Sequence, residues 1–182
     1  IADRLALLAK REKQTVRDLD KNIQVLELTQ GFAYAPLQRE AIRKAMTENC
    51  LVLTGGPGTG KTTTLNAIIS LYEKQGKKVL IAAPTGRAAK RISDLTGYEA
   101  KTIHRLLEVQ FDSNERLTFK HNEKDPLDCE VLVVDEMSMV DISLIHSLLK
   151  AVNVGTRLIL VGDVNQLPSV GPGNVLRDVI NS

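Results

Sequence analysis

A glycine-rich loop between an apolar run and a helical pattern is the feature that most constrains the fold of this 182-residue chain. The apolar residues Leu51–Thr54 lead directly into the loop Gly55-Gly56-Pro57-Gly58-Thr59-Gly60-Lys61-Thr62. From about Lys61, apolar residues recur at helical spacing, and the pattern ends at Gly76. The sequence therefore predicts a buried strand, a tight loop and a helix in immediate succession.

The same alternation of short apolar runs and helical patterns continues toward the C-terminus. Further strands are predicted over Val79–Ala83, Val131–Asp135 and Arg157–Val161, and a last helical pattern covers Val175–Ile180. Strands that alternate with helices need crossover connections, which place helices on both faces of a parallel sheet. We therefore predict an α/β fold built on one parallel sheet with helices on both faces.

Helical periodicity also predicts which side chains face the core. Two helices are expected to open the chain, and a third is expected to begin near Pro36. The inward residues of the first two helices are expected to be Ile1, Leu5 and Leu8, and then Val16, Leu19, Ile23 and Leu26. In the helix bracketed by Pro84 and Gly97, they are expected to be Ala88, Ile92 and Leu95.

The segment from Glu108 to Asp128 does not follow this rhythm. Apolar and polar side chains alternate on both sides of Asn114, with the apolar positions at Val109, Phe111, Leu117 and Phe119. Alternation with a period of two is typical of strands. We predict a small hairpin inserted before the third strand.

The glycine-rich loop fits the pattern G-x-x-x-x-G-K-[ST] and has the chemistry of a phosphate site. Glycines let backbone N–H groups turn toward an anion without Cβ clashes, and the following helix N-terminus favours negative charge. Lys61 would reach the β- and γ-phosphates of a triphosphate, and the Thr62 hydroxyl would ligate Mg²⁺. The candidate nucleotide-binding residues here are Gly56, Pro57, Gly58, Thr59, Gly60, Lys61, Thr62 and Thr63. The competing interpretation is a structural glycine turn that binds no ligand.

Two adjacent carboxylates follow the apolar residues Val131–Val134. This is the Walker B arrangement, in which Asp135 would hold Mg²⁺ and Glu136 would polarise the attacking water. The glutamate favours hydrolysis of a nucleotide over small-molecule kinase chemistry, from which water must be excluded. The sequence contains neither the NKxD motif of GTPases nor the LSGGQ motif of transporter-type ATPases. The simpler alternative is that the acidic pair caps the next helix.

Basic residues are unevenly distributed, although the net charge is only +2. The segment from Thr85 to Arg105 contains five basic and two acidic residues and therefore nets +3. This excess fits a site for a phosphate backbone, but it also fits a solvated helix face.

Cys50 and Cys129 are far apart, and each lies just before an apolar run. They predict buried free thiols, because neither belongs to a spacing that would bind a metal. Free thiols fit a reducing cytoplasm. No apolar run approaches the length of about 20 residues that crosses a bilayer, so no membrane association is expected.

Six segments, in order, resemble the front half of superfamily 1 helicases, and their pattern is most similar to the RecD/TraA group. They resemble the Q motif and motifs I, Ia, Ib, II and III of that family. These segments are Pro36–Glu40, Gly55–Thr63, Ala83–Arg91, Thr102–Leu106, Val134–Met139 and Leu160–Pro168. The resemblance covers roughly residues 32–176 and implies a RecA-like P-loop NTPase fold that uses ATP and Mg²⁺.

The resemblance also implies roles for individual residues. Gln38 is expected to read the adenine edge, because an amide can both donate and accept hydrogen bonds. Gln166 is expected to complete a catalytic set with Lys61 and Glu136, facing the γ-phosphate from the end of a fourth strand that lies between the Walker A and Walker B strands. Motifs Ia and Ib line a groove for single-stranded DNA in this family, and the implied contacts here are Thr85, Arg87, Thr102, His104 and Arg105. For His104, a packed structural histidine is a comparable alternative.

The resemblance further implies a division into domains. Residues 31–182 are expected to form the first RecA-like motor domain, and residues 1–30 a helical extension that ends a truncated N-terminal domain. A second RecA-like domain would supply an arginine finger in the parent protein. The chain alone is therefore expected to bind nucleotide, to hydrolyse ATP poorly and not to unwind DNA.

For the parent protein, the resemblance implies a helicase of DNA recombination and repair. It implies 5′→3′ polarity of translocation. It also allows the parent protein to be a subunit of a nuclease complex similar to exodeoxyribonuclease V. Two alternatives remain: a switch or clamp-loader-type ATPase without unwinding activity, and a degenerate subunit that only binds DNA or a partner. The second is disfavoured by the intact set Lys61, Thr62, Asp135, Glu136 and Gln166.

Overall fold

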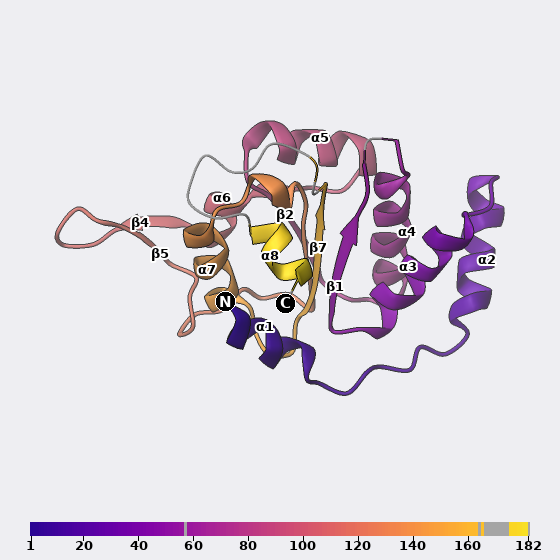
Figure 1. Cartoon of the computed structure of the whole chain (residues 1–182), viewed down its shortest axis with the longest axis horizontal. Helices are drawn as coiled ribbons and strands as arrows, with labels where there is room; N and C mark the ends of the chain where they lie inside the picture. Colours follow the sequence, from indigo (N-terminus) through magenta and orange to yellow (C-terminus); the bar gives the residue numbers. More distant parts are fainter. Residues whose placement is uncertain (57, 164, 166–174, 182) are drawn as a thin grey trace.

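Five parallel strands form the central sheet of the computed structural model, which describes residues 1–56, 58–163, 165 and 175–181 (Figure 1). In spatial order they are β1 (Cys50–Thr54), β7 (Arg157–Gly162), β6 (Val131–Val134), β2 (Val79–Ala83) and β3 (Lys101–Thr102). β7 pairs with β1 on one side and with β6 on the other, as predicted for the fourth strand. Because all the pairs are parallel, the carboxyl ends of the strands meet at one edge of the sheet.

Strands β6 and β7 are almost entirely apolar because both of their faces are covered. Every residue of β6 and β7 is buried, including Arg157 at the start of β7. Val131 and Val133 belong to the core on one face of the sheet, and Leu132 and Val134 belong to the core on the other. Burial on both faces is characteristic of parallel sheets, and it explains why these segments lack a polar alternation.

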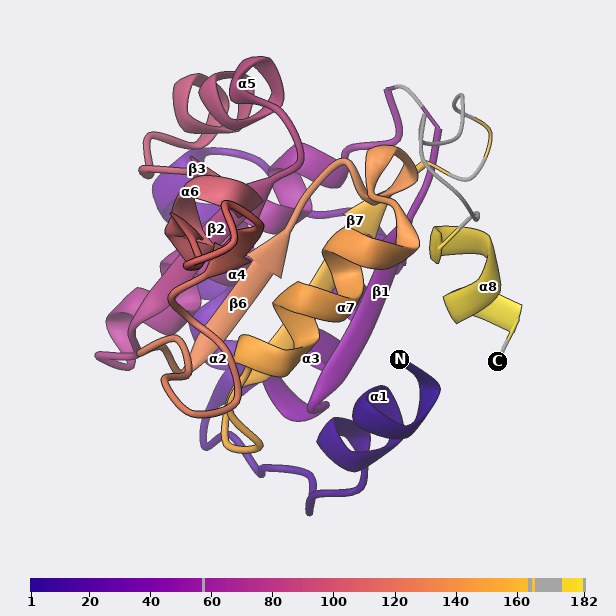
Figure 2. The ribbon, with the colours of Figure 1, turned by 90° about the vertical axis from the view of Figure 1, so that its left-hand side faces the viewer.

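Helices cover both faces of the central sheet. The core on one face includes side chains from α2 (Leu19–Gln30), α3 (Pro36–Thr47), α4 (Lys61–Lys74) and α5 (Gly86–Thr96). The core on the other face includes side chains from α1 (Ala2–Ala9), α6 (Ile103–Leu107), α7 (Ile142–Ala151) and α8 (Val175–Asn181). Figure 2 shows α7 lying along β6 and β7 on this second face. The predicted α/β class is therefore confirmed.

The first two helices pack on different layers. The predicted inward face of α1 is confirmed, because Leu8 is fully buried and Ile1 and Leu5 pack against the same core. Arg4 fastens α1 to the end of α7 by donating hydrogen bonds to the carbonyl oxygens of Leu149 and Val152, at 3.1 and 2.8 Å.

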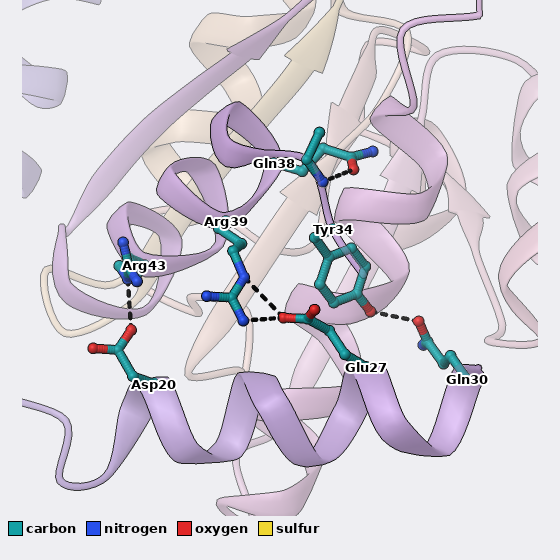
Figure 3. A network of polar contacts seen from close by, with 8 residues as sticks. Asp20, Glu27, Gln30, Tyr34, Gln38, Arg39 and Arg43 are labelled. Atoms are coloured by element: carbon teal, nitrogen blue, oxygen red, sulfur yellow. Dashed lines mark hydrogen bonds and ion pairs between the residues drawn. The ribbon is translucent and has the colours of Figure 1, made fainter. Parts of the chain in front are cut away.

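Helix α2 is joined to α3 by two ion pairs, Glu27 with Arg39 and Asp20 with Arg43 (Figure 3). The helix begins at Leu19, so Val16 precedes it and is not part of its inward face. Val16 nevertheless packs against the same core from the connecting segment.

Of the three residues of α5 that were predicted to face the core, Ile92 is buried, Ala88 is partly buried and Leu95 is exposed. Ala89, Ile92 and Thr96 are buried, whereas Leu95 keeps 52% of its surface exposed. The prediction that Leu95 faces the core is therefore wrong. The core meets the Ala89 side of the helix, and Leu95 lies at the rim of a cavity instead.

The predicted hairpin is confirmed. β4 (Val109–Phe111) pairs antiparallel with β5 (Leu117–Phe119), with Val109 opposite Phe119. It projects away from the sheet (Figure 1). The two-residue strand β3 was not predicted, because two polar residues carry no hydrophobic period.

Cys129 is buried, Cys50 is partly buried, and both are free thiols. Among the helices that the structure describes, none is long and apolar enough to cross a membrane.

Candidate active site

A cavity of about 420 Å³ opens where β1, β6 and β7 end. Its walls are the glycine-rich loop after β1, the acidic pair after β6, the end of β7 and one face of α5. These segments lie far apart in the sequence, and the parallel sheet brings them together because its strands all end at the same edge. The candidate nucleotide-binding residues that line the cavity are Gly56, Gly58, Thr59, Gly60, Lys61 and Thr62.

Two glycines hold the loop in a conformation that other residues rarely adopt. Gly58 and Gly60 have φ angles of +76° and +79°, in the left-handed region. The Thr59 hydroxyl donates a hydrogen bond to the Gly56 carbonyl at 2.8 Å and closes the turn. α4 starts at Lys61, so its first N–H groups, which have no partner within the helix, lie at the cavity. The loop thus has the backbone geometry of an anion site.

Among the predicted nucleotide-binding residues of the segment Gly56–Thr63, one that the structure describes does not line this cavity. Thr63 is partly buried in the first turn of α4 and is not among the cavity-lining residues that the structure describes. Pro57 lies outside the described residues.

Gln38 contacts the glycine-rich loop directly. It lies in the first turn of α3, where its Oε1 accepts a hydrogen bond from the Ala35 N–H at 2.9 Å (Figure 3). Its Nε2 donates to the Gly60 carbonyl at 3.4 Å, and a Cβ added at Gly60 would collide with the same amide. The amide therefore ties α3 to the loop, beside the cavity.

Asp135 directly follows β6, which is the neighbour of β7 in the sheet. Burial is the main cause that raises the pKa of its carboxyl group, and the negative charge of Glu136 acts in the same direction. The hydrogen bond from the Glu136 N–H, at 2.8 Å, and the positive charges of Lys61 and Arg91 lower it. Asp135 is therefore a partly desolvated carboxylate facing two cations across the cavity.

Glu136 adopts a left-handed backbone conformation, with φ at +55°. This conformation costs a residue with a side chain about 1–2 kcal/mol, and such strain is concentrated at functional sites. Glu136 precedes a short 3₁₀ turn, η1 (Met137–Met139), but in the described structure its side chain makes no capping hydrogen bond. α7 is capped instead by Asp141, which accepts from the Leu144 N–H at 2.7 Å. The alternative that the acidic pair caps the next helix is therefore wrong.

The residues at the cavity fit a magnesium–nucleotide complex better than a metal bound by protein alone. Thr62 and Asp135 both line the cavity, and the charge of Asp135 would be balanced by a cation. The described residues include no group of three His, Cys, Asp or Glu side chains that could hold a metal. Mg²⁺ is usually held by one or two carboxylates together with phosphate oxygens, which is the set this site could offer.

Sequence reasoning missed two charged residues of the cavity. Asp163 directly follows β7, is buried to 3% exposure and accepts a hydrogen bond from the Asn165 N–H at 2.9 Å. Its position after an apolar strand repeats that of Asp135 and could have marked it. Arg91, which was predicted only as part of a basic DNA-facing segment, lies on the α5 wall. Gln166 lies outside the described residues.

The residues predicted to contact DNA lie toward β2 and β3. Thr85 and Thr102 cap α5 and α6, and their hydroxyls accept hydrogen bonds from the Ala88 and Arg105 N–H groups, both at 3.1 Å. Because Ala83 pairs with Thr102 across the two strands, the starts of both helices lie at the carboxyl edge of the sheet.

A shallow surface hollow brings together three of these five residues. Thr102, His104 and Arg105 line it beside the base of the hairpin, whereas Thr85 and Arg87 do not. His104 is exposed, with its ring centre 5.9 Å from that of Phe119. An exposed ring that contacts Phe119 is compatible both with a DNA contact and with the alternative of a packed structural histidine. Arg87 and Arg105 are exposed, which suits both a DNA contact and a solvated face.

The parallel sheet, the glycine-rich loop and the acidic pair at its carboxyl edge define the chain as a P-loop NTPase. The family model described as an AAA domain matches residues 38–172. The chain therefore belongs to the AAA domain family.

Two curated relatives refine this placement. The chain is 39% identical over 201 aligned positions to the RecBCD enzyme subunit RecD of Mycolicibacterium smegmatis, covering 98% of the chain and 34% of that protein. It is 48% identical over 123 positions to the ATP-dependent RecD2 DNA helicase of Deinococcus radiodurans, covering 68% of the chain and 16% of that protein. The chain is thus a homologue of RecD-type superfamily 1 proteins and spans a third or less of their length.

A solved structure agrees with this placement. The Pif1 helicase from Candida albicans is 28% identical and superimposes with a TM-score of 0.56, over 77% of this chain and 34% of that one. The resemblance to RecD-type helicases that was inferred from the motifs is therefore confirmed.

Proposed function

We propose that this chain is the ATP-binding and ATP-hydrolysing motor domain of a DNA helicase. The observation that carries the proposal is the single cavity at which Lys61 and Thr62 meet Asp135 and Glu136. Its relatives include a protein named as an ATP-dependent DNA helicase, which supports the same conclusion. For the parent protein, the proposed helicase activity rests only on the sequence similarity to this relative.

In the proposed mechanism, the loop amides and Lys61 bind the β- and γ-phosphates of ATP. Thr62 and Asp135 would hold Mg²⁺, which supplies neutralisation of the charge that develops on the phosphate oxygens. Glu136 accepts a hydrogen bond from the attacking water and orients it toward the γ-phosphate. The strained backbone of Glu136 supports this role, because such strain is concentrated at functional sites.

Two glutamines complete the proposed site. We assign recognition of the adenine edge to Gln38, whose amide already lies against Gly60 and would exchange its hydrogen bonds for those of the base. Gln166 is proposed to contact the γ-phosphate from the segment that follows β7. Substitution of Gln38 should change the preference for ATP over other nucleoside triphosphates. Substitution of Gln166 should lower the rate of ATP hydrolysis.

Single-stranded DNA is the proposed polymer substrate, with Thr85, Arg87, Thr102, His104 and Arg105 as its contacts. The exposure of His104, Arg87 and Arg105 supports this, because phosphate contacts require accessible donors. Thr85 and Thr102 could contact a phosphate only by sharing hydroxyls that also cap helices.

For the parent protein we propose an organisation like that of its RecD relatives. Residues 31–182 would be the first motor domain, residues 1–30 the end of a preceding helical domain, and a second RecA-like domain would complete the ATP site. The parent would act in DNA recombination and repair with 5′→3′ polarity. Assembly into a RecBCD-type nuclease complex, also called exodeoxyribonuclease V, is proposed from the printed name of its relative. The free thiols fit a cytoplasmic location.

Titration calorimetry of the chain with Mg-ATP and Mg-ADP tests the nucleotide site. Lys61→Ala is expected to abolish measurable binding, because the mutation removes the cation that neutralises the phosphates. Lys74→Ala, at the other end of α4, is the matched control and should bind like the wild type. Unchanged nucleotide affinity in Lys61→Ala would refute the proposal.

The alternative function is an ATPase switch or clamp-loader-type subunit. Stimulation of ATP hydrolysis in the parent protein distinguishes the two, because a translocating motor hydrolyses more ATP on longer single strands. A stimulation that is independent of strand length would favour the switch.

A further inference from the structure

One face of α5 forms a wall of the nucleotide cavity. The residues on this face are Ala88, Arg91, Ile92 and Leu95, which recur at helical spacing. Three of the four are apolar, so Arg91 is the only charged side chain that α5 presents to the cavity. Figure 1 shows α5 lying at the end of the sheet that also carries the loop between β1 and α4.

The surroundings of Arg91 leave its positive charge free for a ligand. The guanidinium acts electrostatically on Asp135 across the cavity. Within the described part of the chain, however, none of the ion pairs within 4 Å includes Arg91. Arg91 is also exposed, so its long side chain can reach into the cavity without losing an existing partner.

The position of Arg91 in the cavity indicates which part of a bound nucleotide it would contact. The glycine-rich loop and the first turn of α4 would surround the β-phosphate, and Asp135 with Thr62 would hold Mg²⁺ between the β- and γ-phosphates. Arg91 lies on α5, a different element from the loop, and it acts on the Mg²⁺-binding Asp135. A guanidinium that lines the cavity and lies close enough to act on Asp135 would face the terminal phosphate of a bound triphosphate, where two oxygens would match its fork of N–H donors.

We propose that Arg91 binds the γ-phosphate of ATP and makes this domain discriminate between nucleoside triphosphate and diphosphate. The inference rests on the proposed ATP site and adds to it a residue of this domain that senses the terminal phosphate. Arg91 therefore belongs to the nucleotide site, although it lies within the basic segment that the sequence associated with DNA.

The test compares the affinities of the chain for Mg-ATPγS and Mg-ADP by titration calorimetry. Arg91→Ala is expected to weaken binding of ATPγS by about tenfold or more, because a charge-assisted hydrogen bond to phosphate is lost. ADP lacks the γ-phosphate, so its affinity should change by less than about twofold. Arg91→Lys keeps the charge without the fork and should fall between the two.

Lys90→Ala provides the matched control. It removes one positive charge from the neighbouring residue of the same helix, but Lys90 is exposed and is not among the cavity-lining residues that the structure describes. This variant should bind both nucleotides like the wild type. Alanine is favourable in a helix, so both alanine variants should fold, and thermal unfolding would verify this.

The pattern of ATPγS and ADP affinities distinguishes γ-phosphate binding by Arg91 from a role that is limited to balancing the charge of Asp135. An equal loss of ATPγS and ADP affinity in Arg91→Ala would overturn the inference, because it would mean that Arg91 only balances the charge of Asp135. Unchanged affinity for both ligands would also overturn it. Neither result would touch the proposed function, which fails only if the wild type binds no nucleotide or if Lys61→Ala binds it normally.

Discussion

The nucleotide edge of the sheet and the hairpin edge beside β3 differ in how far their polar groups are satisfied within the chain. At the nucleotide edge, burial raises the pKa of the Asp135 carboxyl group, and the Glu136 side chain makes no capping hydrogen bond in the described structure. At the hairpin edge, the φ of Glu108 is +56°, close to the +55° of Glu136, but its carboxylate pairs with Lys120 at 2.7 Å, and the Thr102 hydroxyl caps α6. The bond to Lys120 lowers the pKa of Glu108.

Polar groups without a partner in the described chain are therefore candidates for ligand binding, and paired groups are candidates for a structural role. A desolvated charge persists only where the surrounding structure enforces it, and a bound ligand of opposite charge offsets its cost. Groups that already have partners contribute to stability and gain less from a ligand. The first region should therefore respond to mutation mainly in function, and the second mainly in stability.

The largest effect is expected for Glu136→Gln. This variant should hydrolyse ATP about 10²–10⁴ times more slowly, because an amide cannot act as the general base. Nucleotide affinity should be retained, since the loop and Lys61 are intact. Single-turnover hydrolysis with the protein in excess would measure the rate. Glu99→Gln, at an exposed position outside the site, is the control, and an equal loss in both variants would break the distinction between the two regions.

Gly60→Ala should affect stability and function together. Its φ of +79° makes a Cβ cost about 1–2 kcal/mol, and that Cβ would also collide with the Gln38 amide. Gly76→Ala is the matched control, because its φ is +70° but no atom lies within 4 Å of the added Cβ. Urea unfolding should show a larger loss for Gly60→Ala, and calorimetry should show weaker nucleotide binding for that variant alone. Equal losses in both variants would mean that Gln38 moves aside freely.

Thr85→Ala should cost about 1 kcal/mol of stability, because it removes the cap of α5. Thr85→Ser keeps the hydroxyl and should restore stability. Urea unfolding and the anisotropy of a labelled single strand would be measured on the same proteins. A loss of DNA affinity in Thr85→Ala without a loss of stability would show that the hydroxyl serves the ligand and would weaken the contrast.

The smallest effect is a pH dependence that has opposite signs at the two edges. Asp135 has a raised pKa, so its contribution favours the folded state below the unfolded pKa and is lost as pH rises through the folded value. Asp135→Asn should therefore stabilise the nucleotide-free chain at pH 7 and not at acidic pH.

Glu108 has a lowered pKa, so its contribution is present above the unfolded pKa and is lost as pH falls through the folded value. Glu108→Gln should destabilise the chain slightly at pH 7, with a difference that shrinks toward acidic pH. Urea unfolding between pH 4 and 7 would measure both variants. If both substitutions changed the free energy of unfolding at pH 7 in the same direction, the comparison of the two edges would be contradicted.

Local sequence patterns were sufficient for most of the secondary structure. The strands at Val79–Ala83 and Arg157–Gly162, the helix beginning at Lys61 and the hairpin around Asn114 all follow from apolar spacing and turn residues. The face of α5 did not, because Ala88 and Ala89 are both apolar and only the packed neighbours decide which of them points inward. The short strand β3 was missed for a related reason, since it depends on pairing with Ala82 and Ala83.

The glycine-rich loop, with the strand before it and the helix after it, was sufficient to predict a phosphate site in an α/β fold. The reason is local, because glycines, Lys61 and a helix N-terminus are adjacent in the sequence. Only the folded structure revealed that Asp163 and Arg91 line the same cavity as this loop, because no local sequence pattern relates them to it. Their positions depend on which strands become neighbours and on how α5 is rotated, and both are set by long-range packing of the apolar side chains.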